Sequence, residues 1–393
     1  MVTSFPSKTP ELLLKNMEGE LYRPDEGRYL GCFDDDGTLL GSILMMDFTL
    51  NVRGVMTPMG AAAYVSTNFL RKKEHVARTL LEVLMRYYAR SGAPISCLHP
   101  FNPAFYHKMG YGFCNENTLY APKPCYIRSF GDKSGLCYAQ ADDREAVLAY
   151  YRRWVERTHG ATLHHYMDPH RIFDMPYVVL CRREGRITGY FTFEFVEVDH
   201  YTDCYHDLLV REMVYDDLDT LKQFMTFFAS QGDQIERVRF LSPDPDLHML
   251  FLNPDTGENR AHDGCIQEIG RRTMGYMCRI LDVAAYFRSQ PHCSAPAARD
   301  FVLELQVEDG FLKDNTGSYF LRVSGDRVEP AGNAAPQVTL RTDIAALSSL
   351  VMGAYSLDKA VARGVMDISD PSFLPDVQNA IGWHGKPVNY TYF

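Results

Sequence analysis

Patterns of hydrophobic and polar residues predict two similar groups of elements, one near the start and one in the middle of the chain. In residues 29–45, two apolar segments flank a turn that ends in Asp36-Gly37, and this arrangement is typical of a β-hairpin. Residues 177–193 repeat it around Glu184-Gly185. The repetition predicts a duplicated α/β domain, whereas two unrelated hairpins are the simpler alternative.

A further strand and a helix follow each hairpin. In the first copy, residues 61–66 have a strand pattern and residues 75–91 have a helical one, with Gly92 placed to end the helix. The second copy has a strand pattern at 208–214 and a helical pattern at 218–230. One apolar stripe predicts the buried face of the first helix: Val76, Leu80, Leu81, Leu84, Tyr87 and Tyr88.

The sequence changes character near residue 288. Residues 289–298 carry two prolines and several small residues, which predicts a linker. Alternating apolar residues then predict half-buried strands, at Phe301, Leu303, Leu305 and Val307, at Phe320, and at Val338 and Leu340. Short helices are predicted at 343–352 and 356–364, each closed by a glycine.

Together these patterns predict an α/β fold with α+β layers in three domains. We expect a first domain at residues 1–133, its second copy at 134–287, and a separate α+β domain at 288–393.

Composition and charge exclude some partner classes. The chain is 46% hydrophobic and 23% charged, as globular proteins are. Its net charge of −10 argues against nucleic acid and favours cationic small molecules. No signal-peptide or membrane-spanning pattern is visible, so we expect a cytoplasmic protein that does not contact membranes. The ten cysteines are widely spaced, which predicts reduced thiols.

The loop at 68–74 is the clearest candidate for a ligand-binding site. It joins a predicted strand to a predicted helix and carries Arg71, Lys72 and Lys73, so backbone N–H groups, the positive helix end and basic side chains converge there. This favours a pyrophosphate site, although a solvated basic turn has the same composition. The matching turn of the second copy, 215–219, carries three aspartates and would repel a pyrophosphate.

Other chemistry-bearing clusters are less specific. Three histidines lie near one aspartate, namely His159, His164, His165 and Asp168, but without the spacing of tetrahedral zinc ligands, so we expect no metal site. Cys97 and His99 share one face of a strand, and buried packing is a better interpretation than a nucleophile with its base.

Two segments resemble the GCN5-related N-acetyltransferases. Residues 71–76 are similar to the R/Q-x-x-G-x-G/A segment of that family, and residues 100–111 are similar to its FY-x-x-x-G-[FY] segment. Residues 211–214, 278–283 and 343–347 extend the resemblance to the Eis (enhanced intracellular survival) acetyltransferases. Those proteins have two acetyltransferase folds followed by a sterol-carrier-protein-like domain, and the resemblance implies the same fold here.

The resemblance also implies a site. Acetyl-CoA would be held by the residues Val65, Arg71, Lys72, Lys73, Glu74, His75, Val76 and Phe101. Tyr106 matches the family's general acid, which protonates the leaving thiolate, whereas without the resemblance a core aromatic is the better interpretation. The terminal carboxylate of Phe393 would orient the amine in the active site, and a frayed terminus is the alternative. Glu74 departs from the family, which has glycine there.

The resemblance implies acetyl-CoA-dependent N-acetylation of a cationic, aminoglycoside-like amine by direct attack on the thioester, and the negative net charge is compatible with such a substrate. Asp25 and Glu26 are expected to contact this substrate. The family resemblance further implies a homo-oligomer such as a hexamer. The alternatives are a protein-lysine acetyltransferase and a non-catalytic ligand or lipid carrier that has lost acetyl-CoA binding.

Overall fold

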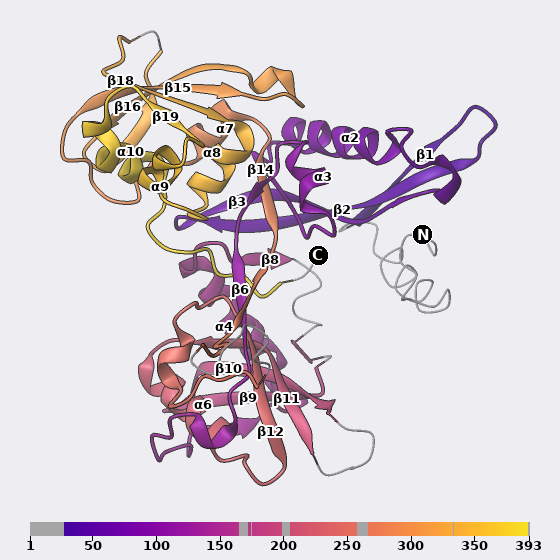
Figure 1. Ribbon diagram of the computed structural model, residues 1–393, viewed down its shortest axis with the longest axis vertical. Helices are drawn as coiled ribbons and strands as arrows, with labels where there is room; N and C mark the ends of the chain where they lie inside the picture. Colours follow the sequence, from indigo (N-terminus) through magenta and orange to yellow (C-terminus); the bar gives the residue numbers. More distant parts are fainter. Residues whose placement is uncertain are drawn as a thin grey trace.

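Three β-sheets with packed helices organise the chain (Figure 1). The computed structural model describes residues 27–164, 172–173, 175–198, 205–257, 266–332 and 334–391. Within these ranges no helix is long and apolar enough to span a membrane. Sheets and helices of this kind confirm the α/β fold class with α+β layers.

The first sheet begins with two consecutive hairpins. In spatial order its strands are β1 (Gly27–Phe33), β2 (Leu39–Val52), β3 (Val55–Thr67), β4 (Ile95–Leu98), β14 (Met277–Ile280) and β5 (Gly112–Phe113), and β8 (Thr162–His164) also pairs with β2. β1 and β2 are antiparallel across a turn that ends in Gly37, where φ is 79°. The hairpin predicted at 29–45 is therefore confirmed, and glycine suits this turn because that φ is left-handed.

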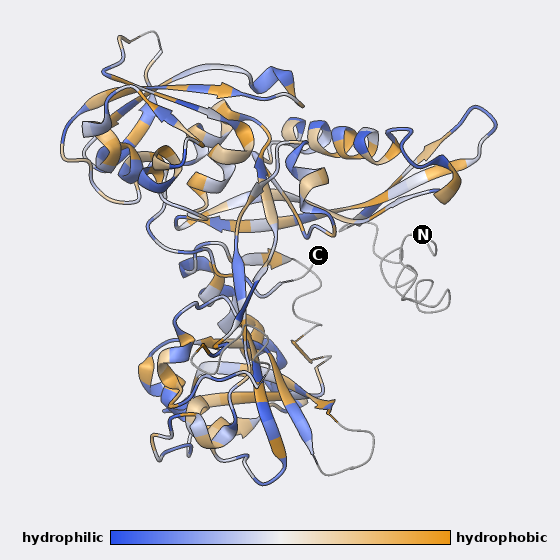
Figure 2. Ribbon diagram, viewed as in Figure 1, coloured by the Kyte–Doolittle hydropathy of each residue, from blue (hydrophilic) through white to orange (hydrophobic). Residues whose placement is uncertain are grey.

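Helix α2 (Val76–Arg90) lies along this sheet and alternates hydrophobic with hydrophilic residues (Figure 2). Its buried side chains are Val76, Leu80, Leu81, Leu84, Met85 and Tyr88. The helix predicted at 75–91 is confirmed, but the burial predicted for Tyr87 is wrong. Tyr87 is 38% exposed and accepts a hydrogen bond from Arg28. It lies at the border of the apolar stripe, where a phenol can keep its hydroxyl at the surface.

The second sheet contains the second hairpin. Its strands, in spatial order, are β13 (Arg271–Met274), β6 (Glu116–Tyr120), β12 (Ile235–Ser242), β11 (His206–Tyr215), β10 (Arg186–Glu197), β9 (Tyr177–Arg183) and β7 (Leu136–Tyr138). Helices α4 (Arg144–Arg157) and α6 (Leu218–Ala229) pack on it, and α6 buries Phe224 and Phe228 in its core. β9 and β10 are antiparallel, so the hairpin predicted at 177–193 is confirmed.

The third sheet follows the predicted linker. Its strands, in spatial order, are β17 (Arg327–Pro330), β16 (Gly317–Ser324), β15 (Phe301–Glu308), β18 (Val338–Asp343) and β19 (Asp367–Ile368). Helix α7 (Val283–Ser289) precedes the linker, and the helices that follow it are α8 (Ile344–Val351), α9 (Leu357–Ala362) and α10 (Leu374–Ile381). Asp343 begins α8 by accepting a hydrogen bond from the N–H of Ala346 at 2.8 Å, as N-cap residues do.

The first and third sheets share one hydrophobic core. Leu44 and Ile95 of the first sheet belong to the same buried cluster as Leu303 and Leu347 of the third part. Helix α8 also joins the two parts through Ser348, whose Oγ accepts a hydrogen bond from the N–H of Ile280 in β14 at 3.0 Å. The C-terminal part is therefore packed directly behind the first sheet.

Strands cross between the first two sheets. β6 precedes residue 133 yet lies in the second sheet, whereas β8 and β14 follow residue 133 yet lie in the first. The backbone hydrogen bonds of these strands tie the first two parts together. The division of the chain into three domains at residues 133 and 287 therefore stays a prediction.

Candidate functional site

A parallel pair of strands opens at one point of the first sheet. β3 and β4 run parallel, and their last paired residues are Ala62 and Leu98. β4 ends at Leu98 whereas β3 continues to Thr67, so the backbone around Val65 extends past the end of its neighbour. In open α/β sheets, ligands bind where parallel strands end and separate. Val65 therefore lies where an extended ligand chain can align with β3.

The loop between β3 and α2 contains two left-handed residues. The turn η1 (Phe69–Arg71) begins at Asn68, whose side-chain oxygen accepts a hydrogen bond from the N–H of Leu70 at 3.0 Å. Lys73 has a φ of 69° and His75 a φ of 63°, conformations in which side chains other than glycine are strained. α2 starts directly after His75, so its first N–H groups and its positive dipole end face the loop.

The charges of this loop are partly paired with one another. Arg71 Nε donates to both carboxylate oxygens of Glu74, at 3.0 and 2.8 Å, and Arg71 Nη1 lies 3.5 Å from Asp34. The hydrogen bond and charge of Glu74 raise the pKa of Arg71. The Lys72 ammonium lies 3.8 Å from the centroid of the Phe69 ring. Glu74 itself has no positive φ, so its backbone does not need the glycine that the family has there.

Tyr106 lies on the short helix α3 (Pro103–His107). Asn102 begins this helix, because its side-chain oxygen accepts a hydrogen bond from the N–H of Phe105 at 3.3 Å. Tyr106 is 2% exposed and belongs to the hydrophobic cluster that also contains Val76 of α2 and Leu98 of β4. Tyr106 thus belongs to the same buried cluster as the first residue of α2 and the last residue of β4.

Aromatic rings surround the Tyr106 phenol. Edge-to-face contacts join it to Phe101, Phe105 and Tyr111, with centroid distances of 5.9, 5.2 and 6.2 Å. Burial raises the pKa of Tyr106 well above its ordinary value, because the apolar surroundings disfavour phenolate. The hydroxyl is therefore protonated near neutral pH and can act as a proton donor. Phe101 is 77% exposed, so its outer face is open to a ligand.

The C-terminal tail runs between the first two sheets (Figure 1). The tail contacts α4, β8 and the segment between them. The Val388 N–H donates to the His159 carbonyl oxygen at 2.9 Å, and Thr162 Oγ1 donates to Asn389 Oδ1 at 3.3 Å. The rings of Tyr390 and Trp154 lie 6.2 Å apart between centroids, and Thr391 Oγ1 lies 3.2 Å from the Tyr151 hydroxyl. On the first sheet, His99 Nε2 lies 3.2 Å from the carbonyl oxygen of Thr391. Phe393, Asp25 and Glu26 lie outside the described residues.

The second sheet opens at the corresponding place, but the tail lies there. β11 and β12 are parallel up to Val210 and Phe240, after which β11 continues to Tyr215. The pocket at this point is lined by Tyr390 together with Val210, Glu212, Met213, Phe240, Leu241 and Ser242. Tyr390 of the tail therefore forms one wall of the opening in the second sheet.

The start of α6 differs from the start of α2 as its sequence predicts. Asp217 Oδ1 accepts a hydrogen bond from the N–H of Thr220 at 2.9 Å, and Asp217 Oδ2 accepts one from Arg183. The Tyr150 hydroxyl donates to Asp216 at 2.8 Å. Carboxylates thus occupy the helix start where an anionic ligand would bind.

The sequence predicts buried packing for His99 and no metal site at His159, but it does not predict the contact of His99 with the C-terminal tail. His99 directly follows β4 on the way to α3, and this position was the available signal for a place near the site. His159 is buried, accepts a hydrogen bond from the N–H of Arg53 at 3.0 Å, and lies 3.1 Å from the Met352 carbonyl oxygen. His165 and Asp168 lie outside the described residues. Elsewhere in the described ranges, no cluster of metal-ligating side chains is found.

Family models match three consecutive stretches of the chain. Residues 2–114 and 150–280 each match an acetyltransferase (GNAT) domain, and residues 284–390 match a sterol carrier protein domain. No curated protein sequence matches the chain significantly.

Solved structures resemble the fold over nearly its full length. A GCN5-related N-acetyltransferase from Anabaena variabilis has a TM-score of 0.77 at 19% identity, covering 96% of this chain and 93% of its own. Eis1 from Mycobacterium abscessus has a TM-score of 0.73 at 18% identity, covering 93% and 90%. A probable N-acyltransferase from Enterococcus faecalis has a TM-score of 0.80 at 17% identity, covering 100% and 95%.

The fold and the domain matches define an acyltransferase of the GNAT class. Its two GNAT domains are followed by a sterol carrier protein domain, and Eis1 shares this fold, so the resemblance to the Eis proteins seen in the sequence is confirmed for the domain layout and the fold.

Proposed function

We propose that the chain is an acetyl-CoA-dependent N-acetyltransferase that acts on the amines of a cationic, aminoglycoside-like small molecule. The observation that carries this proposal is the convergence of three features in the first part of the chain. These are the opening beside Val65, the N-terminus of α2 at His75, and the buried phenol of Tyr106. The C-terminal tail contacts the same part of the chain, because the carbonyl oxygen of Thr391 lies next to His99, which follows β4.

The cofactor fits the residues present. The β3 backbone around Val65 would hold the pantetheine arm, and the loop N–H groups up to Val76 would hold the pyrophosphate. Arg71, Lys72 and Lys73 would supply positive charge, of which Arg71 is partly neutralised by Glu74. When bound there, acetyl-CoA supplies the thioester whose acetyl group is transferred.

The chain's own groups then handle the protons. The amine forms a bond to the thioester carbonyl carbon as the carbon–sulfur bond breaks, and Tyr106 gives its proton to the departing sulfur. The Tyr106 phenol is neutral and so has a proton to donate, and burial, which raises the pKa of Tyr106, makes it a weaker acid than an exposed phenol. The α-carboxylate of Phe393 would orient the ammonium group and assist its deprotonation through water. Asp25 and Glu26 would attract the cationic substrate.

The first test is thiol release from acetyl-CoA with a multi-amine aminoglycoside. We expect substrate-dependent turnover that falls about 100-fold in Tyr106→Phe, as loss of a general acid does. A variant lacking Phe393 should also lose activity. Tyr111→Phe is the matched control, because Tyr111 is an equally buried phenol of the same cluster whose hydroxyl contacts Ser96 Oγ at 2.8 Å. It should retain kcat while lowering stability.

The outcomes separate the alternative functions. Turnover with lysine peptides but not with aminoglycosides would identify a protein acetyltransferase. If acetyl-CoA at 100 times the expected Kd fails to add the ~2.7 kcal/mol of stability that binding requires, the carrier function replaces catalysis. Cytoplasmic location and a homo-oligomer such as a hexamer are proposed with the function. Light scattering tests the oligomer.

A further inference from the structure

A buried ion pair joins the C-terminal part to the first sheet. Arg279 of β14 binds Asp309, which directly follows β15, and both side chains are fully buried. Replacing buried ion pairs by apolar residues is often neutral or stabilising, so stability alone is a weak reason for this pair. The presence of this ion pair is better explained by the parts of the structure that the two side chains hold in place.

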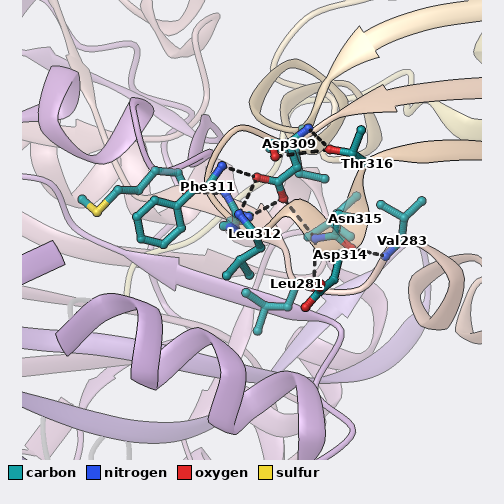
Figure 3. A network of polar contacts seen from close by, with 12 residues as sticks. Leu281, Val283, Asp309, Phe311, Leu312, Asp314, Asn315 and Thr316 are labelled. Atoms are coloured by element: carbon teal, nitrogen blue, oxygen red, sulfur yellow. Dashed lines mark hydrogen bonds and ion pairs between the residues drawn. The ribbon is translucent and has the colours of Figure 1, made fainter. Parts of the chain in front are cut away.

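Asp309 is fixed by a dense network of donors (Figure 3). Its Oδ1 accepts hydrogen bonds from the N–H groups of Phe311 at 3.0 Å and Leu312 at 2.9 Å. Its Oδ2 accepts from Asn315 Nδ2 at 3.1 Å. The same Asn315 amide donates to the carbonyl oxygen of Leu281 at 3.0 Å, just beyond β14. The carboxylate therefore has a single, well-defined position relative to Arg279.

Arg279 uses its other terminal nitrogen on the turn that follows Tyr106. Arg279 Nη1 donates to the carbonyl oxygen of Met109, and a side chain at Gly110, where φ is 80°, would overlap the guanidinium. In the same turn, the N–H groups of Met109 and Tyr111 donate to the Tyr106 carbonyl oxygen at 2.9 and 3.2 Å. The guanidinium thus fixes the turn that carries the Tyr106 backbone.

We propose that Arg279 and Asp309 are positioning residues for Tyr106, so that the C-terminal domain forms a structural part of the acetyl-transfer site. This inference rests on the proposed function of Tyr106 as general acid. Asp309 orients the guanidinium of Arg279, Arg279 holds the turn at Met109, and the turn sets the direction of the phenol. The fork of the guanidinium is needed, because one nitrogen faces the carboxylate and the other the carbonyl.

The decisive variant is Arg279→Met combined with Asp309→Asn. It leaves no buried charge, and asparagine can still accept the hydrogen bonds from Phe311 and Leu312. We expect kcat to fall about 10- to 100-fold, because small misplacements of catalytic groups have effects of that size. The Kd of acetyl-CoA should change less than about 2-fold, since the variant leaves the α2 loop intact.

Asp314→Asn is the control from the same loop. Asp314 makes an exposed ion pair with Arg86, and its loss should leave kcat unchanged.

The same double variant in a Tyr106→Phe background separates positioning from general damage. If the pair acts through Tyr106, it should lower kcat by less than about 2-fold once the phenol is gone. An equal loss in both backgrounds would overturn the proposal, as would wild-type kcat in the double variant. If Tyr106→Phe alone leaves kcat unchanged, the proposed acid role fails instead.

A conservative variant covers the case in which the double variant does not fold. Arg279→Lys keeps the charge that faces Asp309 but has a single nitrogen for two acceptors. We expect an intermediate loss of kcat, about 3- to 10-fold, that also disappears in the Tyr106→Phe background. A folded Arg279→Lys protein with wild-type kcat would contradict the need for the second donor.

Discussion

His99 Nε2 lies 3.2 Å from the carbonyl oxygen of Thr391, although 292 positions separate the two residues in the sequence. His99 follows β4 on the path to α3, and Thr391 lies in the tail that the second part of the chain holds. The contact brings the end of the chain to the strand that leads to Tyr106.

Truncating Tyr390 should uncouple the tail from catalysis. Tyr390 lines the pocket where β11 and β12 separate, and it packs against Trp154. We expect Tyr390→Ala to lower kcat about 10-fold, because the tail loses its anchor and the terminal carboxylate its position. The Kd of acetyl-CoA should not change. Steady-state kinetics and isothermal titration measure the two effects. Tyr390→Phe, which keeps the ring, should behave as wild type, and equal losses in both variants would contradict the anchoring role.

Neutralising Glu74 should tighten the binding of acetyl-CoA. The carboxylate of Glu74 binds Arg71 and adds negative charge beside the proposed pyrophosphate position. In Glu74→Gln, we expect the Kd of acetyl-CoA to fall about 3- to 10-fold at low ionic strength and the gain to shrink in salt. Glu82→Gln is the matched control, since Glu82 also pairs with an arginine, Arg86, but further along α2. A similar change in both variants would mean that only the net charge matters.

Local patterns predicted the elements well because their causes are local. The turn at Gly37 and the apolar stripe of α2 follow from backbone conformation and helical period, and both appear in the structure. The crossing of β6 and β14 between sheets could not be predicted in this way. Which strand a short apolar segment pairs with depends on distant partners, such as Cys97 in β4 for Cys278 in β14.

The candidate site shows the same division. The basic loop and the position of Tyr106 were visible as motifs, and the structure brings Tyr106 into one cluster with Val76. The pairing of Arg71 with Glu74 was not predicted, because it depends on the left-handed backbone of Lys73 between them. The hydrogen bond from Arg279 to Met109 joins residues 170 positions apart, and no periodic pattern in the sequence predicts it. Long-range polar contacts of this kind depend on the assembled core.

Acid should destabilise the protein through His159. This buried imidazole accepts a hydrogen bond from the N–H of Arg53, and burial lowers the pKa of His159 from 6.5 to about 4. The unfolded chain therefore binds a proton between pH 6.5 and 4 that the folded protein does not. The associated stability is fully present above pH 6.5 and is lost as the pH falls through this window, by on the order of 3 kcal/mol.

Urea titrations at several pH values between 4 and 7 measure this loss. In His159→Asn, which can still accept from Arg53 but does not titrate, we expect the slope of unfolding free energy against pH to flatten by nearly one proton in this window. His384→Asn is the control, because His384 is exposed and directly follows Trp383, whose ring packs against His159. An unchanged slope in His159→Asn would show that another group takes up the proton.

Gly60→Ala should destabilise the fold and weaken acetyl-CoA binding together. Gly60 lies in β3 directly under α2, and a Cβ built there would overlap the ring of Tyr88. The methyl group must push α2 away from the sheet, so we expect a loss of about 1–3 kcal/mol in urea unfolding, as overpacked cores show. The same displacement moves the start of α2 and should raise the Kd of acetyl-CoA.

Gly310→Ala is the control, because a Cβ there meets nothing within 4 Å, and it should change stability by less than about 0.5 kcal/mol. A destabilised Gly60→Ala protein with unchanged Kd would mean that Tyr88 yields locally and that the helix start does not depend on this contact.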